Sequence, residues 1–96
     1  MKKLRKPITV TVTANGTLTL DSLGHPEAER WKILRTGFGD LDVTPVLEDG
    51  SAWNHPPIRI PSTEKGNWID LDGIDSFVFN NLGGVPDTIT LTPYGD

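Results

Sequence analysis

The 96-residue chain predicts a small all-β domain, an antiparallel β-sandwich or barrel of seven to eight short strands. Three observations lead to this fold class. Apolar residues recur at every second position in several short segments, which is the period of a half-buried strand. Turn-forming Gly, Pro and Asp residues separate these segments at intervals of about ten residues. No segment carries an amphipathic helical pattern longer than two turns.

The chain opens with two segments in which apolar residues alternate with Thr, residues 8–13 and 17–20. A two-residue loop between them would mix apolar and Thr side chains on each face. A three-residue loop, residues 14–16, instead pairs Val12 with Leu18 and leaves one face apolar. We therefore expect a three-residue hairpin in which Gly16 adopts the left-handed conformation. Replacing Gly16 by Val is expected to lower the melting temperature.

Six further short segments are expected to be strands: residues 31–35, 41–47, 58–60, 68–71, 76–79 and 88–94. Pro45 cannot donate a ladder hydrogen bond, so its strand should lie at an edge or carry a bulge. Residues 21–30 should form a loop with at most one helical turn from Pro26. Four aromatic residues are assigned to the core of the sandwich: Trp31, Trp68, Phe77 and Phe79.

The charge of the chain is unevenly distributed. Nine Lys and Arg face 13 Asp and Glu, a formal net charge of −4. Four of the basic residues lie in the first six positions: Lys2, Lys3, Arg5 and Lys6. The remaining chain therefore holds 5 basic and 13 acidic residues, a net charge of −8, which disfavours a nucleic-acid partner. We expect residues 1–7 to form a flexible basic arm and residues 8–96 a single domain. Docking of the arm on an acidic partner surface is the functional alternative.

Composition excludes several classes of protein. The absence of Cys rules out disulfide frameworks, cysteine-ligated metals and cysteine catalysis. No apolar run approaches the ~20 residues of a membrane-spanning helix, and the basic start is not followed by the apolar block of a signal peptide. We expect no membrane association.

No motif for catalysis or cofactor binding is recognisable. Asp70, Asp72 and Asp75 are interpreted as turn residues around Gly73, because the spacing of a calcium loop is missing. The two histidines, His25 and His55, lie beside Pro and are interpreted as solvated. The prediction is therefore a non-enzymatic protein with no cofactor and no metal site.

Trp53 is the aromatic residue most expected to be exposed, because it lies in a Pro-rich loop, residues 51–57. An exposed Trp could stack on a sugar ring or anchor a protein interface. Alternatively, its ring folds back over the prolines of its own loop. Together with Lys2, Lys3, Arg5 and Lys6, Trp53 is the candidate for partner binding.

The chain resembles small β-sandwich accessory proteins of tailed bacteriophage virions. The resemblance rests on the Thr-alternating opening, residues 8–20, the similar ending, residues 89–94, and the length. It implies a structural virion protein without catalysis, made in the host cytoplasm, that decorates or stabilises a capsid by binding the major capsid protein or another virion protein. Such proteins often form trimers, so a homo-oligomer is expected. The alternatives are a head–tail connector or tail component, or a carbohydrate-binding module that uses Trp53.

Overall fold

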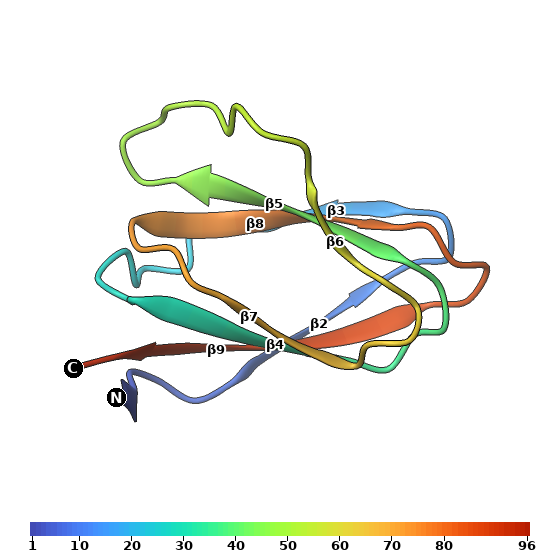
Figure 1. Cartoon of the computed structure of the whole chain (residues 1–96), viewed down its shortest axis with the longest axis horizontal. Helices are drawn as coiled ribbons and strands as arrows, with labels where there is room; N and C mark the ends of the chain where they lie inside the picture. The colour runs from blue at the N-terminus through green and yellow to red at the C-terminus, as the bar shows by residue number, and fades with distance from the viewer.

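The computed structural model describes residues 1–96 and consists of nine β-strands in two antiparallel sheets that face each other (Figure 1). The strands are β1 (Lys2–Lys3), β2 (Ile8–Val12), β3 (Thr17–Thr19), β4 (Arg30–Arg35), β5 (Leu41–Leu47), β6 (Ile58–Ile60), β7 (Gly66–Ile69), β8 (Ile74–Asn81) and β9 (Asp87–Gly95). Sheet A has the order β1-β9-β4-β7, with β2 on the same edge of β9 as β1, and sheet B has the order β3-β8-β5-β6. Of the two predicted all-β architectures, sandwich or barrel, the structure is the sandwich, and it has nine strands where seven to eight were expected.

The space between the sheets is filled by apolar side chains. Thirteen buried hydrophobic residues form one cluster, to which strands of both sheets contribute. Trp31 of β4 packs edge-on against Phe77 of β8 at a ring-centroid distance of 5.6 Å, and Phe77 stacks on Phe79 at 5.8 Å. Phe77 and Phe79 point inward, as their shared period predicts. The aromatic rings therefore join the two sheets through the centre of the sandwich.

The expected hairpin between residues 8–13 and 17–20 is wrong. Strand β2 pairs with β9 in sheet A, whereas β3 pairs with β8 in sheet B. The turn at residues 13–16 therefore carries the chain from one sheet to the other. Asn15, with φ of 54°, is its left-handed residue. A Cβ on Gly16 would lie 2.1 Å from Thr13 Oγ1 and 3.1 Å from the Thr13 carbonyl oxygen, so a larger residue at position 16 would force the Thr13 side chain to move. The Gly16→Val substitution is still expected to destabilise the domain, but through this clash.

Strand β5 bears out the expectation for Pro45. Residues Leu41–Val43 pair with both β6 and β8, whereas Pro45 pairs with β8 alone. A register shift follows between Val46 and Leu47. Pro45 thus lies in the part of β5 where only β8 pairs with the strand. The other edge is free there, so the missing N–H of the proline costs no ladder hydrogen bond on that edge.

The N-terminal residues differ from the expected free arm. Strand β1 pairs with the end of β9, with Lys2 opposite Gly95 and Lys3 opposite Tyr94. The Leu4 N–H donates to the Pro93 carbonyl at 2.9 Å, and the Leu4 side chain packs against the core. One apolar side chain therefore anchors this basic segment on sheet A. The charged residues around Leu4 remain exposed.

Candidate functional site

The outer face of sheet A brings together basic and aromatic side chains from four strands. Strand register places Lys3, Tyr94 and Arg30 in one row across β1, β9 and β4. The neighbouring row includes Lys32 of β4 opposite Trp68 of β7. We refer to these five residues as the basic aromatic face. They point outward because the alternate residues of the same strands, such as Trp31 and Ile69, fill the core.

The rings of this face are held by cationic neighbours. Trp68 and Tyr94 lie edge to face with centroids 5.0 Å apart. The Arg30 guanidinium carbon lies 4.0 Å from the centre of the Trp68 ring, and Lys32 Nζ lies 5.5 Å from it. Arg30 Nε is also 2.6 Å from an oxygen of Asp70. These cation–π contacts fix an aromatic surface whose rim is positively charged.

Assignment of Trp68 to the core is therefore wrong, since the residue is 36 % exposed. The physical reason is strand phase. Adjacent residues of a strand point to opposite faces, and Ile69 takes the inward position next to Trp68. Asp70 lies two residues after Trp68 and therefore points to the same face. A charged residue in this position indicates that Trp68 faces solvent.

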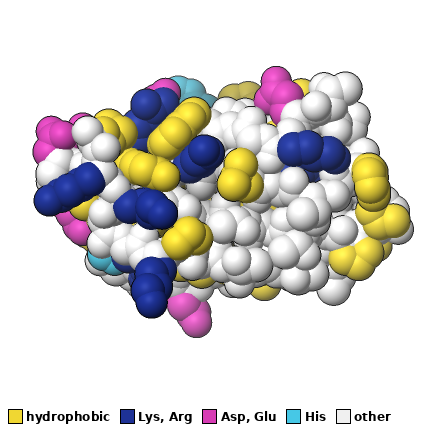
Figure 2. Space-filling model, turned by 90° about the horizontal axis from the view of Figure 1, so that it is seen from below, with side chains coloured by type: hydrophobic (Ala, Val, Ile, Leu, Met, Phe, Trp, Pro, Cys, Tyr) yellow, Lys and Arg dark blue, Asp and Glu magenta, His cyan; other side chains and the backbone are white.

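Several cations on and around the basic aromatic face have no ionic partner. Lys3 and Lys32 form no ion pair, and neither do Lys2 and Lys6 of the N-terminal segment. Figure 2 shows basic and hydrophobic side chains intermingled over the left half of this side of the molecule. Arg5 points elsewhere and donates from Nη1 to the Leu23 carbonyl at 3.2 Å. The uncompensated charge makes the face attractive to an acidic surface.

Trp53 lies apart from this face, in the loop between β5 and β6 on the sheet B side. Its indole N–H donates to the Pro56 carbonyl at 3.2 Å, and its ring meets the His55 ring at 4.9 Å. The ring is half-buried. The structure therefore matches the alternative in which Trp53 folds over its own loop, and does not bring it together with the basic N-terminal residues.

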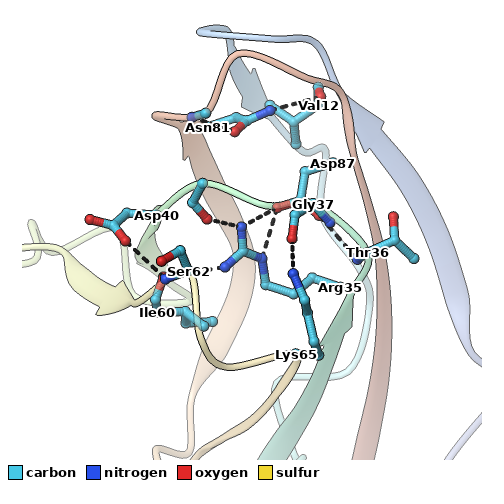
Figure 3. Close-up of polar contacts among 12 residues, drawn as sticks. Val12, Arg35, Thr36, Gly37, Asp40, Ile60, Ser62, Lys65, Asn81 and Asp87 are labelled. Carbon is cyan, nitrogen blue, oxygen red and sulfur yellow. Dashed lines mark hydrogen bonds and ion pairs between the residues drawn. The ribbon is translucent and has the colours of Figure 1, made fainter.

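A buried ion pair at the opposite end of the sandwich escaped the sequence analysis (Figure 3). Arg35 Nε and Nη2 each lie 2.8 Å from Asp87 Oδ2, and both side chains are completely buried. Arg35 also donates to the carbonyls of Ile60, Pro61 and Gly39. Arg35 occupies the same inward-facing positions of the strand as Trp31 and Ile33. A charged residue in this otherwise apolar series is the feature of the sequence that indicates a buried ion pair.

Backbone groups complete the environment of the Asp87 carboxylate. Oδ1 accepts from the N–H groups of Gly37 at 2.8 Å and Thr36 at 3.3 Å. A Cβ on Gly37 would lie 2.5 Å from Asp87 Cγ, so only glycine allows this approach. The Lys65 ammonium donates to the Gly37 carbonyl. With every oxygen and guanidinium nitrogen bonded, the pair joins β4, β9 and the loops after β4 and β6.

The remaining polar clusters are local. Hydrogen bonds from the Ser51 hydroxyl and N–H lower the pKa of Asp49, and a hydrogen bond from His25 lowers the pKa of Glu27. A hydrogen bond to Asp42 raises the pKa of Arg59. No group of three or more His, Asp or Glu residues could hold a metal ion, and no pocket is present. No helix of the structure could span a membrane.

The sequence matches no protein-family model and no curated protein sequence. Among solved structures, a de novo designed double-stranded β-helix aligns with 94 % of this chain and 100 % of its own at a TM-score of 0.55 and 12 % identity. A protein of the Bacillus endospore appendages, which form disulfide-linked pili, aligns over 100 % and 93 % at a TM-score of 0.53 and 8 % identity. A Cupin_2 domain of an XRE family transcriptional regulator from Enterobacter cloacae aligns over 99 % and 95 % at a TM-score of 0.51 and 11 % identity. At these identities the likeness establishes a shared two-sheet β architecture.

Proposed function

We propose that this chain is a non-enzymatic structural subunit that docks on a larger protein assembly through the basic aromatic face. The assembly proposed is a virus particle, on which the chain would decorate or stabilise the capsid by binding the major capsid protein. The observation that carries the proposal is the collection of Lys3, Arg30, Lys32, Trp68 and Tyr94 on one outer sheet face of a chain with net charge −4.

The chemistry of this face suits a protein partner with an acidic surface. Arg, Trp and Tyr are the residues most enriched among those that dominate binding energy at protein interfaces. Lys3 and Lys32 have no ionic partner within the chain, so no intramolecular ion pair has to break when they meet a carboxylate. Electrostatic attraction would also speed the encounter between the two proteins.

The interior supports a surface function rather than a catalytic one. Trp31, Phe77 and Phe79 occupy the centre of the sandwich, where a substrate cavity would otherwise lie. The buried Arg35–Asp87 pair is saturated by hydrogen bonds, so it serves to hold strands and loops together.

A sandwich of this architecture also occurs in an assembly subunit, since one structural neighbour comes from pili that are disulfide-linked. The present chain has no cysteine, so its own assembly would rest on non-covalent contacts. Shape complementarity and charge would then decide the partner.

Binding of the purified protein to purified phage procapsids and mature capsids, followed by co-sedimentation, tests the proposal. The variant Lys3→Gln/Lys32→Gln should weaken binding by about tenfold, because it removes two cations from the face. The control Asn54→Glu/Thr63→Glu changes the net charge by the same two units. Its two positions are exposed and lie in the β5–β6 and β6–β7 loops, outside the basic aromatic face, so this variant should bind like the unmodified protein.

Equal losses in the two variants would attribute binding to net charge alone and would contradict the proposed surface. Absence of binding to either capsid form would remove the capsid from the proposal, and binding to isolated connector or tail complexes would then relocate the subunit within the particle. A glycan-binding role is not favoured, because Arg30 already covers a Trp68 ring face and Trp53 is tied to its own loop. Glycan-array signals lost in Trp53→Ala would reverse that judgement.

A further inference from the structure

Strand β2 forms an edge of sheet A that lacks the usual protection against pairing with another strand. Its five residues pair with β9 on one side, and no strand covers the other side. Edge strands are commonly protected by Lys, Pro or bulges. Here the thirteen residues 8–20 contain no charged residue and no proline, in a chain with 23 % charged residues. The free N–H and C=O groups of β2 are therefore open to a further strand.

An apolar seam runs beside this edge. Strands β2 and β3 are joined by the short turn at residues 13–16 and form the edges of the two sheets on the same side of the sandwich. On this side β2 pairs with β9 and β3 pairs with β8. Six half-buried apolar side chains lie along it: Leu4, Ile8, Val10, Leu18, Leu20 and Leu23. An added layer would complete their burial.

We propose that β2 pairs with β2 of a second copy of this chain, antiparallel and centred on Val10, to form a two-fold symmetric dimer. This register places Val10 opposite Val10, Ile8 opposite Val12 and Thr9 opposite Thr11. Apolar residues then meet apolar residues and Thr meets Thr, as in the Thr9–Thr90 and Thr11–Thr88 pairs that β2 already makes with β9, where the hydroxyl oxygens are 3.4 Å apart. A shift by one residue would destroy this match.

Charge and size both fit a second copy as the occupant. The cation nearest to β2 along the chain, Lys6, would lie eight residue positions from its symmetry mate in this register, about 27 Å, which is well beyond the Debye length of ~8 Å. Figure 1 views the sandwich with its sheets edge-on, along its shortest axis, and in this view the whole molecule, which includes the side carrying β2 and β3, has an outline of 36 × 27 Å. That area can supply the ~800 Å² per partner of a standard interface.

The dimer also has a consequence for partner binding. Because the two-fold axis passes through the pair of Val10 residues perpendicular to the sheet, both copies of sheet A become one continuous sheet. Their two basic aromatic faces then point to the same side. Two identical faces on one dimer would bind an ordered array of acidic sites with avidity.

Sedimentation-velocity ultracentrifugation of the isolated protein tests the dimer without any partner. The unmodified chain should form a concentration-dependent dimer. The variant Thr9→Lys/Thr11→Lys places like charges directly opposite across the axis and should weaken the dimer by about tenfold. The control Thr88→Lys/Thr90→Lys adds the same charges one strand further from the axis and should leave dimerisation nearly unchanged. Mixing the first variant with Thr9→Glu/Thr11→Glu should restore dimers that contain one copy of each.

A single introduced cysteine tests the register directly, because the chain has none of its own. Val10→Cys should form a disulfide-linked dimer under mild oxidation. Ile8→Cys should not, since its symmetry mate lies about 14 Å away along the strand, beyond the 4.4–6.8 Å Cα separation of a disulfide.

A monomer at all concentrations, a trimer, or a dimer that the β2 charge variants do not weaken would overturn the inference. Efficient cross-linking at Ile8→Cys but not at Val10→Cys would overturn the register. These results are independent of capsid binding, so failure of the dimer and failure of the proposed function remain distinguishable.

Discussion

Replacing Asp87 by Asn measures how strongly the buried ion pair holds the loop end of the sandwich. Asn keeps the shape of the side chain and an oxygen that can accept from the Gly37 N–H, but it leaves the Arg35 guanidinium without a counter-charge. Both side chains are fully buried, so water cannot solvate the guanidinium that has lost its counter-charge. Removing one partner of such a pair costs about 3–5 kcal/mol. A domain of this size has a total stability of roughly 5–14 kcal/mol.

The effect is therefore a large fraction of the free energy of unfolding. Urea titration followed by tryptophan fluorescence and circular dichroism should show the loss, and the melting temperature should fall by at least about 12 °C. Arg35→Met should lower the free energy of unfolding by a similar amount. The double variant Arg35→Met/Asp87→Asn should cost less than the two single losses added together, because the second substitution removes the charge that the first one stranded. A loss below about 1 kcal/mol for Asp87→Asn, or strict additivity, would refute the reasoning.

Three further effects are expected. Gly37→Ala should destabilise the domain by about 1–3 kcal/mol in the same titration, because its Cβ would lie 2.5 Å from Asp87 Cγ. Trp31→Ala should cost about 3–5 kcal/mol, whereas Trp68→Ala should cost far less, because only Trp31 is fully buried; equal losses would contradict the assignment of faces. By NMR titration the Asp49 carboxyl should have a pKa below the usual Asp value. Since the folded value is the lower one, its stabilisation is present above the unfolded pKa of about 3.8 and is lost as the pH falls through the folded value. Ser51→Ala should reduce the shift, because it removes the hydroxyl donor and keeps the backbone N–H donor.

The alternation of side chains predicted which residues form strands and which face many of them take. Phe77 and Phe79 point inward as expected, and the segment around Pro45 has a free edge and a register shift. Trp68 was misassigned because size was given more weight than phase. The adjacent Ile69 takes the inward position and Asp70 the outward one. The phase rule applied consistently would have placed the Trp on the outer face.

Strand partners could not be predicted in the same way. A strand followed by a tight turn and a second alternating strand gives the same pattern whether the two pair with each other or enter opposite sheets, because the apolar face points inward in both cases. The choice here depends on residues far along the chain. Asn81 accepts from the Gly83 N–H and donates to the carbonyls of Thr13 and Val85, which ties the turn to the end of β8.

The basic aromatic face was invisible to sequence inspection for a related reason. Lys3, Arg30, Lys32, Trp68 and Tyr94 are spread over the whole length of the chain, and only the pairing of β1, β9, β4 and β7 brings them together. The basic N-terminal segment was recognised from composition, whereas its position beside two aromatic rings depends on long-range register.

Lysine modification read by mass spectrometry is the most direct test of which surface meets the partner. The protein is acetylated free in solution and when bound to capsids, and the extent of modification at each lysine is compared. Lys3 and Lys32 should be protected in the bound state, while Lys65, which bonds the Gly37 carbonyl at the other end of the sandwich, should be modified equally in both. Unchanged modification of Lys3 and Lys32 together with protection of Lys65 would contradict the account.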